Sequence, residues 1–148
     1  MKINEWYNAK LEQFGENDFR SLNWGDKEGK SAKTRYQQMF EQYNWSNKNI
    51  LEVGCGWGSF FDFGFTCQEY VGLDINKNFI NLAEKKHPKN IWLTEYPNQG
   101  FFRNRNYNQF DVCISSGVAG NRNGPAWNPN LLKDFLNQMY NLSKTVMV

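Results

Sequence analysis

The chain has 148 residues, of which 40% are hydrophobic, and 17 Lys and Arg against 15 Asp and Glu give it a net charge of +2. This length predicts one domain over residues 1–148, and so small a charge gives no general case for a nucleic-acid partner. Apolar runs reach about five residues where a membrane-spanning helix needs about 20, and the polar start is no signal peptide. We therefore expect a cytoplasmic protein with no membrane contact.

The cysteine and histidine content limits metal and redox chemistry. Cys55, Cys67 and Cys113 form no CxxC pair and are odd in number, which argues against a disulfide frame. A single histidine, His87, cannot supply the two imidazoles of an HExxH zinc site. We therefore expect no metal.

The first third of the chain predicts helices. Apolar residues from Tyr7 to Phe14 recur at helical spacing up to Gly15, which is a typical C-terminal cap. Residues 19–29 are polar and turn-rich, and a second apolar stripe predicts a helix over about residues 31–43. We expect residues 1–45 to form a helical cap on a core that spans residues 46–148.

In that core, short apolar strands alternate with helices. We expect strands at 49–53, 69–73, 91–94, 109–115 and 145–148, and helices at 58–65, between Asn76 and Pro88, and from Asn128 and Pro129 onward. Alternation of this kind predicts a Rossmann-like three-layer α/β sandwich with a mainly parallel sheet. Ligands of such sheets bind beyond the carboxyl ends of the strands.

The segment from Glu52 to Gly58, EVGCGWG, follows the first strand and opens a helix. Its glycines allow a tight turn and close approach of a ligand, and the helix that follows offers unpaired N–H groups. A nicotinamide fingerprint needs glycine at position 59, where this chain has Ser59, so a nicotinamide-dependent reductase is disfavoured. The Glu52 carboxylate would repel a diphosphate and attract an ammonium group. The pattern therefore predicts a nucleoside with an amino-acid tail.

Polar residues follow the next three strands. Asp74 lies 20 residues after Gly54 and can accept hydrogen bonds from both ribose hydroxyls, while Glu95 can accept one from an exocyclic amine. Ser115, Ser116 and Gly117 follow the fourth strand and face the same crevice. A helix-capping role for Asp74, a solvated loop position for Glu95 and a backbone-bonding role for the serines remain open alternatives.

The segments ILEVGCGWG, YVGLDIN and FDVCISSG, in this order, resemble the class I S-adenosylmethionine-dependent methyltransferases over about residues 48–148. The lead-in LNWGDKEGKSAKTRYQQMFE resembles that of a group of small members. The resemblance implies strand order 3-2-1-4-5, without the last two strands of the family's seven. It also implies S-adenosylmethionine as cofactor, S-adenosylhomocysteine as product and a small-molecule methyl acceptor.

The resemblance also implies positions for the cofactor. The methionine part would meet Glu52, Gly58 and the backbone of Gly54, Cys55 and Gly56. The nucleoside would meet Asp74, Ile75, Glu95 and Tyr96, while Ser115 and Gly117 would lie under the sulfonium and the methionine tail. Two residues of the cap, Trp24 and Arg35, would close over the cofactor, and Arg35 would contact the carboxylate of the cofactor. The alternatives are a core position for Trp24 and an exposed helix position for Arg35.

Two further expectations concern partners. DNA-methylating relatives carry Pro-Pro-aromatic or Pro-Cys motifs near the fourth strand, and Ser115 to Val118 match neither, so we expect no nucleic-acid acceptor. The fifth strand would leave an apolar edge open, which predicts a homo-oligomer or a longer polypeptide. The alternative function is an S-adenosylmethionine-binding module without transferase activity. Such a module would be a sequestering or regulatory protein or one subunit of an assembly.

Overall fold

The computed structural model describes residues 3–95, 109–118 and 129–148. Its helices are α1 (Ile3–Phe14), α2 (Lys30–Glu41), α3 (Ser59–Asp62), α4 (Lys77–Lys86) and α6 (Pro129–Leu142), with a 3-10 helix η1 (Phe19–Leu22). Its strands are β1 (Asn49–Val53), β2 (Glu69–Asp74), β3 (Ile91–Thr94), β4 (Phe110–Ile114) and β5 (Ser143–Met147). The expected cap residue Asn128 lies outside the described residues. No helix within the described ranges is long and apolar enough to span a membrane.

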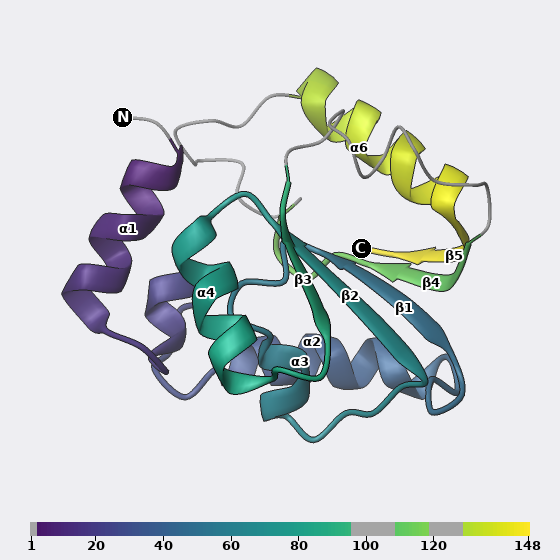
Figure 1. Cartoon of the computed structure of the whole chain (residues 1–148), viewed down its shortest axis with the longest axis horizontal. Coiled ribbons are helices and arrows are strands. Elements are labelled where there is room, and N and C mark those ends of the chain that lie inside the picture. Colours follow the sequence, from purple (N-terminus) through teal and green to yellow (C-terminus); the bar gives the residue numbers. More distant parts are fainter. Residues whose placement is uncertain (1–2, 96–108, 119–128) are drawn as a thin grey trace.

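The five strands form one sheet in the order β3-β2-β1-β4-β5, and each neighbouring pair is parallel (Figure 1). The predicted α/β fold and strand order are therefore confirmed. Because all strands run the same way, their carboxyl ends share one edge of the sheet. The register places Glu52 opposite Gly72 on one side and opposite Ile114 on the other.

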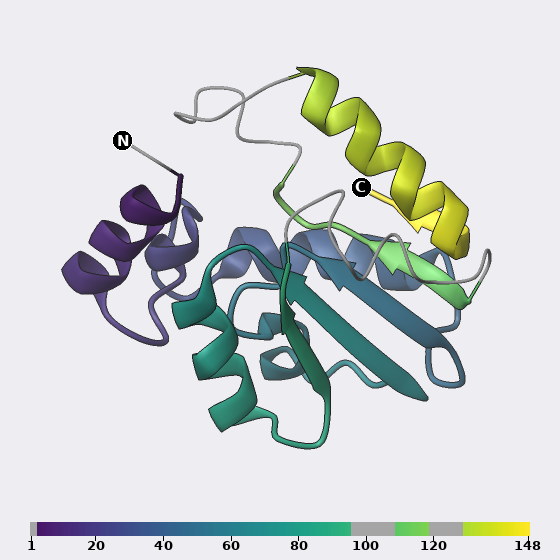
Figure 2. The ribbon, with the colours of Figure 1, turned by 45° about the horizontal axis from the view of Figure 1, so that its top comes forward.

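Helices cover both faces of the sheet, and the two faces differ in composition. Helices α2, α3 and α4 cover one face, and α6 covers the other over β4 and β5 (Figures 1 and 2). The first face is rich in aromatic side chains, with Tyr36, Trp45, Phe60, Tyr70 and Trp92 in one buried cluster. The α6 face is mainly aliphatic and contains the alternate residues of the same strands.

The N-terminal segment packs beside α4 at the carboxyl edge of the sheet. The Asn4 side-chain amide donates to the Ile75 carbonyl (3.1 Å), and the Asn76 amide donates to Asn8 (2.9 Å). Phe19 of η1 is buried against Trp57. The cap therefore borders the edge at which the sequence motifs lie.

Three elements differ from the sequence expectation. The helix expected over 58–65 is the single turn α3, because Gly64 takes a positive φ of 80° just after its C-cap residue Phe63. Helix α1 starts before Tyr7, at Ile3. Strand β5 begins at Ser143, directly after α6, where the Ser143 hydroxyl donates to the Met139 carbonyl (2.8 Å).

Candidate functional site

A glycine loop joins β1 to α3 at the carboxyl edge of the sheet. Gly54, Gly56 and Gly58 have φ values of 75°, 56° and 81°, in the left-handed region that L-residues with a side chain rarely adopt. The amides of Gly54 and Cys55 both donate to the Leu73 carbonyl, at 2.8 and 3.0 Å. The loop is thereby fixed across the end of β2, and its three glycines carry no side chain that would keep a ligand from the main chain.

Two side chains from other segments border this loop. A Cβ on Gly54 would overlap Val118, which follows β4, and a Cβ on Gly56 would lie 2.6 Å from Leu22 of η1. The Cys55 side chain turns into the core, so only its backbone is available to a ligand. The β4 loop and the N-terminal cap therefore meet at the glycine loop, and a ligand above it would lie among these three segments.

Asp74 ends β2 and joins the glycine loop to α4. Its Oδ2 accepts from the Gly56 amide (2.9 Å) and its Oδ1 from the Asn76 amide (2.8 Å). Burial raises the pKa of this carboxyl, against the opposing effect of the amide hydrogen bonds. Since a carboxylate has about four lone-pair positions, two remain for further donors. The structure thus brings together the two motifs that sequence spacing singled out.

Glu52 lies in a different environment. Its Oε1 accepts from the Tyr36 hydroxyl and its Oε2 from the Tyr70 hydroxyl, and the side chain is 0% exposed. Burial raises the pKa of Glu52 to about 7, against the two tyrosine hydrogen bonds, and the charge of Asp74 adds to the rise. We expected Glu52 to contact an ammonium group, but the structure directs it under α2, so that contact stays a prediction.

The other strand ends carry polar atoms that lack partners. The Ser115 hydroxyl and Glu95 Oε2 are buried without a hydrogen-bond partner among the described residues. The Glu95 amide donates to the Asp74 carbonyl (3.0 Å), which holds Glu95 next to the end of β2. Ile75 lies between Asp74 and α4, and Tyr96 lies outside the described residues. A ligand with hydrogen-bonding groups would satisfy these buried atoms.

The two cap residues singled out from the sequence lie together. The guanidinium carbon of Arg35 lies 5.0 Å from the centre of the Trp24 ring, and Arg35 itself is exposed. A Cβ on Gly117, where φ is 109°, would lie 3.5 Å from Trp24 Cζ2. Trp24 therefore borders the β4 loop, as a residue that covers a bound ligand would.

Sequence reasoning missed three residues of this region. Tyr36 lies in the predicted second helix and Tyr70 in the predicted second strand, and only the need of a buried hydroxyl for a partner pointed to a polar contact. Leu22 gave no recognisable pattern. Within residues 3–95, 109–118 and 129–148, no group of three or more His, Cys, Asp or Glu is placed to hold a metal ion.

Known proteins resemble this chain in both sequence and fold. The phthiotriol/phenolphthiotriol dimycocerosates methyltransferase of Mycobacterium leprae is 28% identical over 99 residues, which cover 55% of this chain and 37% of that protein. The chain thus spans little more than a third of this curated relative.

Two solved structures share the fold. The Haemonchus contortus phosphoethanolamine N-methyltransferase 1, in complex with phosphoethanolamine and S-adenosylhomocysteine, has a TM-score of 0.69 and 13% identity, over 95% of this chain and 30% of that one. The magnesium protoporphyrin IX methyltransferase of Synechocystis, with bound S-adenosylmethionine, has a TM-score of 0.60 and 13% identity, over 97% and 73% of the two chains.

A family model adds a sequence criterion to this likeness of fold. The model described as "Methyltransferase domain" matches residues 51–139, more than half of the chain. The match begins in β1 and contains the glycine loop, Asp74 and the end of β4. The chain therefore belongs to the methyltransferase domain family.

Proposed function

We propose that this chain binds S-adenosylmethionine at the carboxyl ends of β1 and β2 and transfers its methyl group to a small-molecule acceptor. The observation that carries the proposal is the hydrogen bond from the Gly56 amide to the Asp74 carboxylate. It holds a glycine-rich loop and the acid proposed for the ribose side by side, which is the arrangement that a nucleoside with an amino-acid tail requires.

Membership of the methyltransferase domain family supports this proposal, as do the nucleoside ligands named for the two structural neighbours. The residues present also fit the ligand: the glycines of the loop have no side chain to hold a ligand away, and Ser115 and Glu95 offer buried polar atoms without partners among the described residues. When bound, S-adenosylmethionine supplies a methyl group on a positively charged sulfur. The protein then needs to orient the acceptor and exclude water.

Each residue has one part in the proposal. The backbone of Gly54, Cys55 and Gly56 would face the methionine part and Asp74 the ribose. The remaining contacts are with the adenine, the sulfonium side and the outer cover, and the proposed residues for these are Ile75, Glu95, Tyr96, Ser115, Gly117 and Trp24. In this proposal Glu52 meets the ammonium group only if its carboxylate, which is 0% exposed, becomes accessible to the ligand.

Titration calorimetry with S-adenosylhomocysteine tests the binding half of the proposal. Gly56→Ala should weaken binding at least about tenfold, because a Cβ there would lie 2.6 Å from the Leu22 side chain and shift the loop that the ligand would contact. Gly64→Ala is the matched control, since Gly64 also has a positive φ but has open space around it. Equal affinity of both variants, or no binding heat with the unmodified protein, would contradict the proposed site.

Transfer of tritium from methyl-labelled S-adenosylmethionine to a panel of small acceptors tests the catalytic half. Turnover that Gly56→Ala lowers and Gly64→Ala leaves unchanged is the expected result. Binding of S-adenosylhomocysteine without turnover on any acceptor would instead favour the module without transferase activity.

A further inference from the structure

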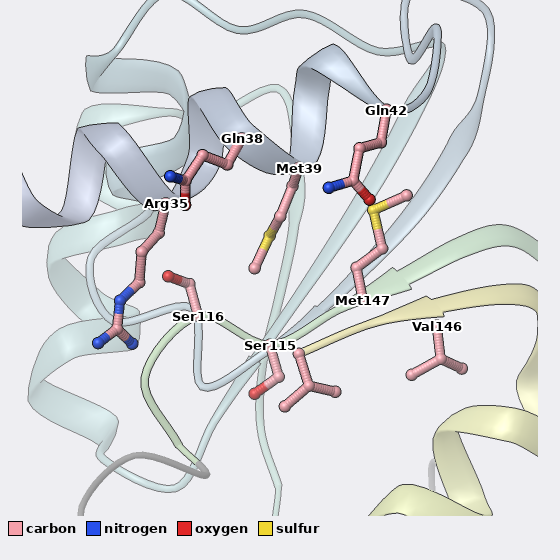
Figure 3. A pocket seen from close by; sticks show the side chains of 9 residues that line it. Arg35, Gln38, Met39, Gln42, Ser115, Ser116, Val146 and Met147 are labelled. Carbon is pink, nitrogen blue, oxygen red and sulfur yellow. The ribbon is translucent and has the colours of Figure 1, made fainter.

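A cavity of about 430 Å³ lies between α2 and the carboxyl ends of β4 and β5 (Figure 3). Helix α2 contributes Arg35, Gln38 and Met39 to its lining, and the C-cap residue of α2, Gln42, also lines it. The glycine loop and Asp74 do not line it, but Ser115 does, so it adjoins the volume proposed for the cofactor at that residue. Its size is in the range of small-ligand sites.

One end of this cavity is polar and positively charged. In Figure 3 the Ser116 hydroxyl lies on the side of Arg35 and Gln38, while the Ser115 hydroxyl points away from α2. Ser116 is 8% exposed, and its hydroxyl has no hydrogen-bond partner among the described residues. A buried hydroxyl without a partner is costly, so a ligand atom that hydrogen-bonds to Ser116 is favoured.

Arg35 supplies the charge at this end. Within the described part of the chain no carboxylate forms an ion pair with Arg35, and no Asp or Glu lines the cavity. A guanidinium group binds a carboxylate through two parallel hydrogen bonds, which suits an anionic group between Arg35 and Ser116.

The other end of the cavity is apolar. Met39 of α2 and Met147 of β5 both reach into it, whereas the neighbouring Val146 side chain points away from α2 toward the α6 face (Figure 3). Methionine side chains are flexible and polarizable and adapt to apolar bodies of different shape. The cavity therefore combines one cationic end with one apolar end.

The polar end lies nearer to the proposed cofactor site. Arg35 contacts Trp24, Trp24 borders Gly117, and Val118 lies against Gly54 of the glycine loop. Among the described residues that line the cavity, Arg35 has the only charged side chain, and no Asp, Glu, His, Lys or Cys is there to accept a proton from an acceptor. An acceptor that binds already deprotonated fits this lining.

We propose that this cavity is the acceptor site and that it takes a small organic acid, bound as its carboxylate anion. Its charged end would lie on Arg35 and Ser116 and its apolar body on Met39 and Met147. The proposal rests on the proposed function, and it assigns Arg35 to the acceptor and not to the carboxylate of the cofactor.

Methionine-methyl NMR with hexanoate as the probe tests this proposal. Hexanoate should shift the signals of Met39 and Met147, and leave that of Met139, which is 0% exposed on the α6 face and serves as an internal control. Hexanamide, which has the same body without the charge, should bind about tenfold more weakly, because charge-assisted hydrogen bonds are lost. Equal binding of the two probes, or a shift of Met139 alone, would overturn the proposal.

Substitution of Arg35 separates the acceptor from the cofactor. Arg35→Gln should weaken hexanoate binding about tenfold and leave the affinity for S-adenosylhomocysteine unchanged. Lys33→Gln, which removes an equal charge from an exposed position on α2 outside the cavity lining, is the matched control and should leave both affinities unchanged.

The other outcomes are distinguishable. If Arg35→Gln abolishes S-adenosylhomocysteine binding and spares hexanoate, Arg35 holds the cofactor and the acceptor proposal fails. If S-adenosylhomocysteine does not bind the unmodified protein, the proposed function fails, and hexanoate binding then cannot mark an acceptor site. If hexanoate does not bind while S-adenosylhomocysteine does, only the acceptor proposal fails.

Discussion

The carboxylates at the ends of β1 and β2 lie at the same edge of one sheet, yet their surroundings are opposite. Asp74 accepts hydrogen bonds from two backbone amides of the glycine loop and α4 and is half-buried. Glu52 is enclosed by two tyrosine hydroxyls on the aromatic face and has no exposed surface. One acid therefore shapes the ligand edge, while the other lies within the core beneath it.

The difference follows from position within the strand. Asp74 is the last residue of β2 and can turn toward the following loop, whereas Glu52 is followed by Val53 within β1. Alternation sends Glu52 to the same face as Ile50, under α2, and sends Val53 to the α6 face. An acid near a strand end thus predicts a ligand contact only when its direction is also known.

The largest effect should be the pH dependence of stability that Glu52 causes. Its pKa is raised from 4.5 to about 7, so between these values the folded protein holds a proton that the unfolded chain releases. Its contribution is full below pH 4.5 and is lost as the pH rises toward 7, by about 3 kcal/mol in the free energy of unfolding. Urea unfolding at a series of pH values measures it.

Glu52→Gln is the control for this pH dependence of the free energy of unfolding. The amide cannot ionise, so stability should change much less over the same pH range, and the difference between the two proteins isolates Glu52 because Asp74 and His87 are present in both. Parallel pH profiles of the two proteins would show that Glu52 is not the titrating group and would remove the contrast with Asp74.

A smaller effect on stability, but a larger one on binding, should follow from Asp74→Asn. The amide can accept only one of the two backbone hydrogen bonds and places an N–H₂ group against the other amide, which costs about 2 kcal/mol of unfolding free energy. S-adenosylhomocysteine affinity should fall at least about tenfold. Calorimetry with unchanged affinity would exclude Asp74 from the ligand site.

The smallest effect should come from a carboxylate in a surface ion pair at the opposite edge. Lys144 Nζ lies 2.8 Å from Asp111 Oδ1, and the Lys144 side chain is 62% exposed, so solvent screens the pair. Lys144→Gln should change the free energy of unfolding by less than about 1 kcal/mol. If Lys144→Gln lowered the free energy of unfolding as much as Asp74→Asn does, burial would not explain the different contributions of Asp74 and Asp111 to stability.

Much of the framework was predictable from the sequence, because it depends on local patterns. Apolar runs located all five strands, and the glycine loop and Asp74 lie where the motif spacing placed them. The contacts of Glu52 were not predictable, since Tyr36 and Tyr70 approach it from 16 and 18 residues away. Gly64, which ends α3 early, and the cavity at Arg35 likewise depend on backbone conformation and on the path of α2 over the sheet.

Two consecutive residues of helix α2 contact different parts of the molecule. The Tyr36 hydroxyl donates a hydrogen bond to Glu52 of β1, the strand that precedes the glycine loop, and Arg35 lines the cavity at β4 and β5. A displacement of this one helix alters the hydroxyl contact and the cavity wall together. A substitution that moves α2 is therefore expected to change the surroundings of both Glu52 and the cavity, whereas Arg35→Gln, which removes a charge without moving the helix, is not.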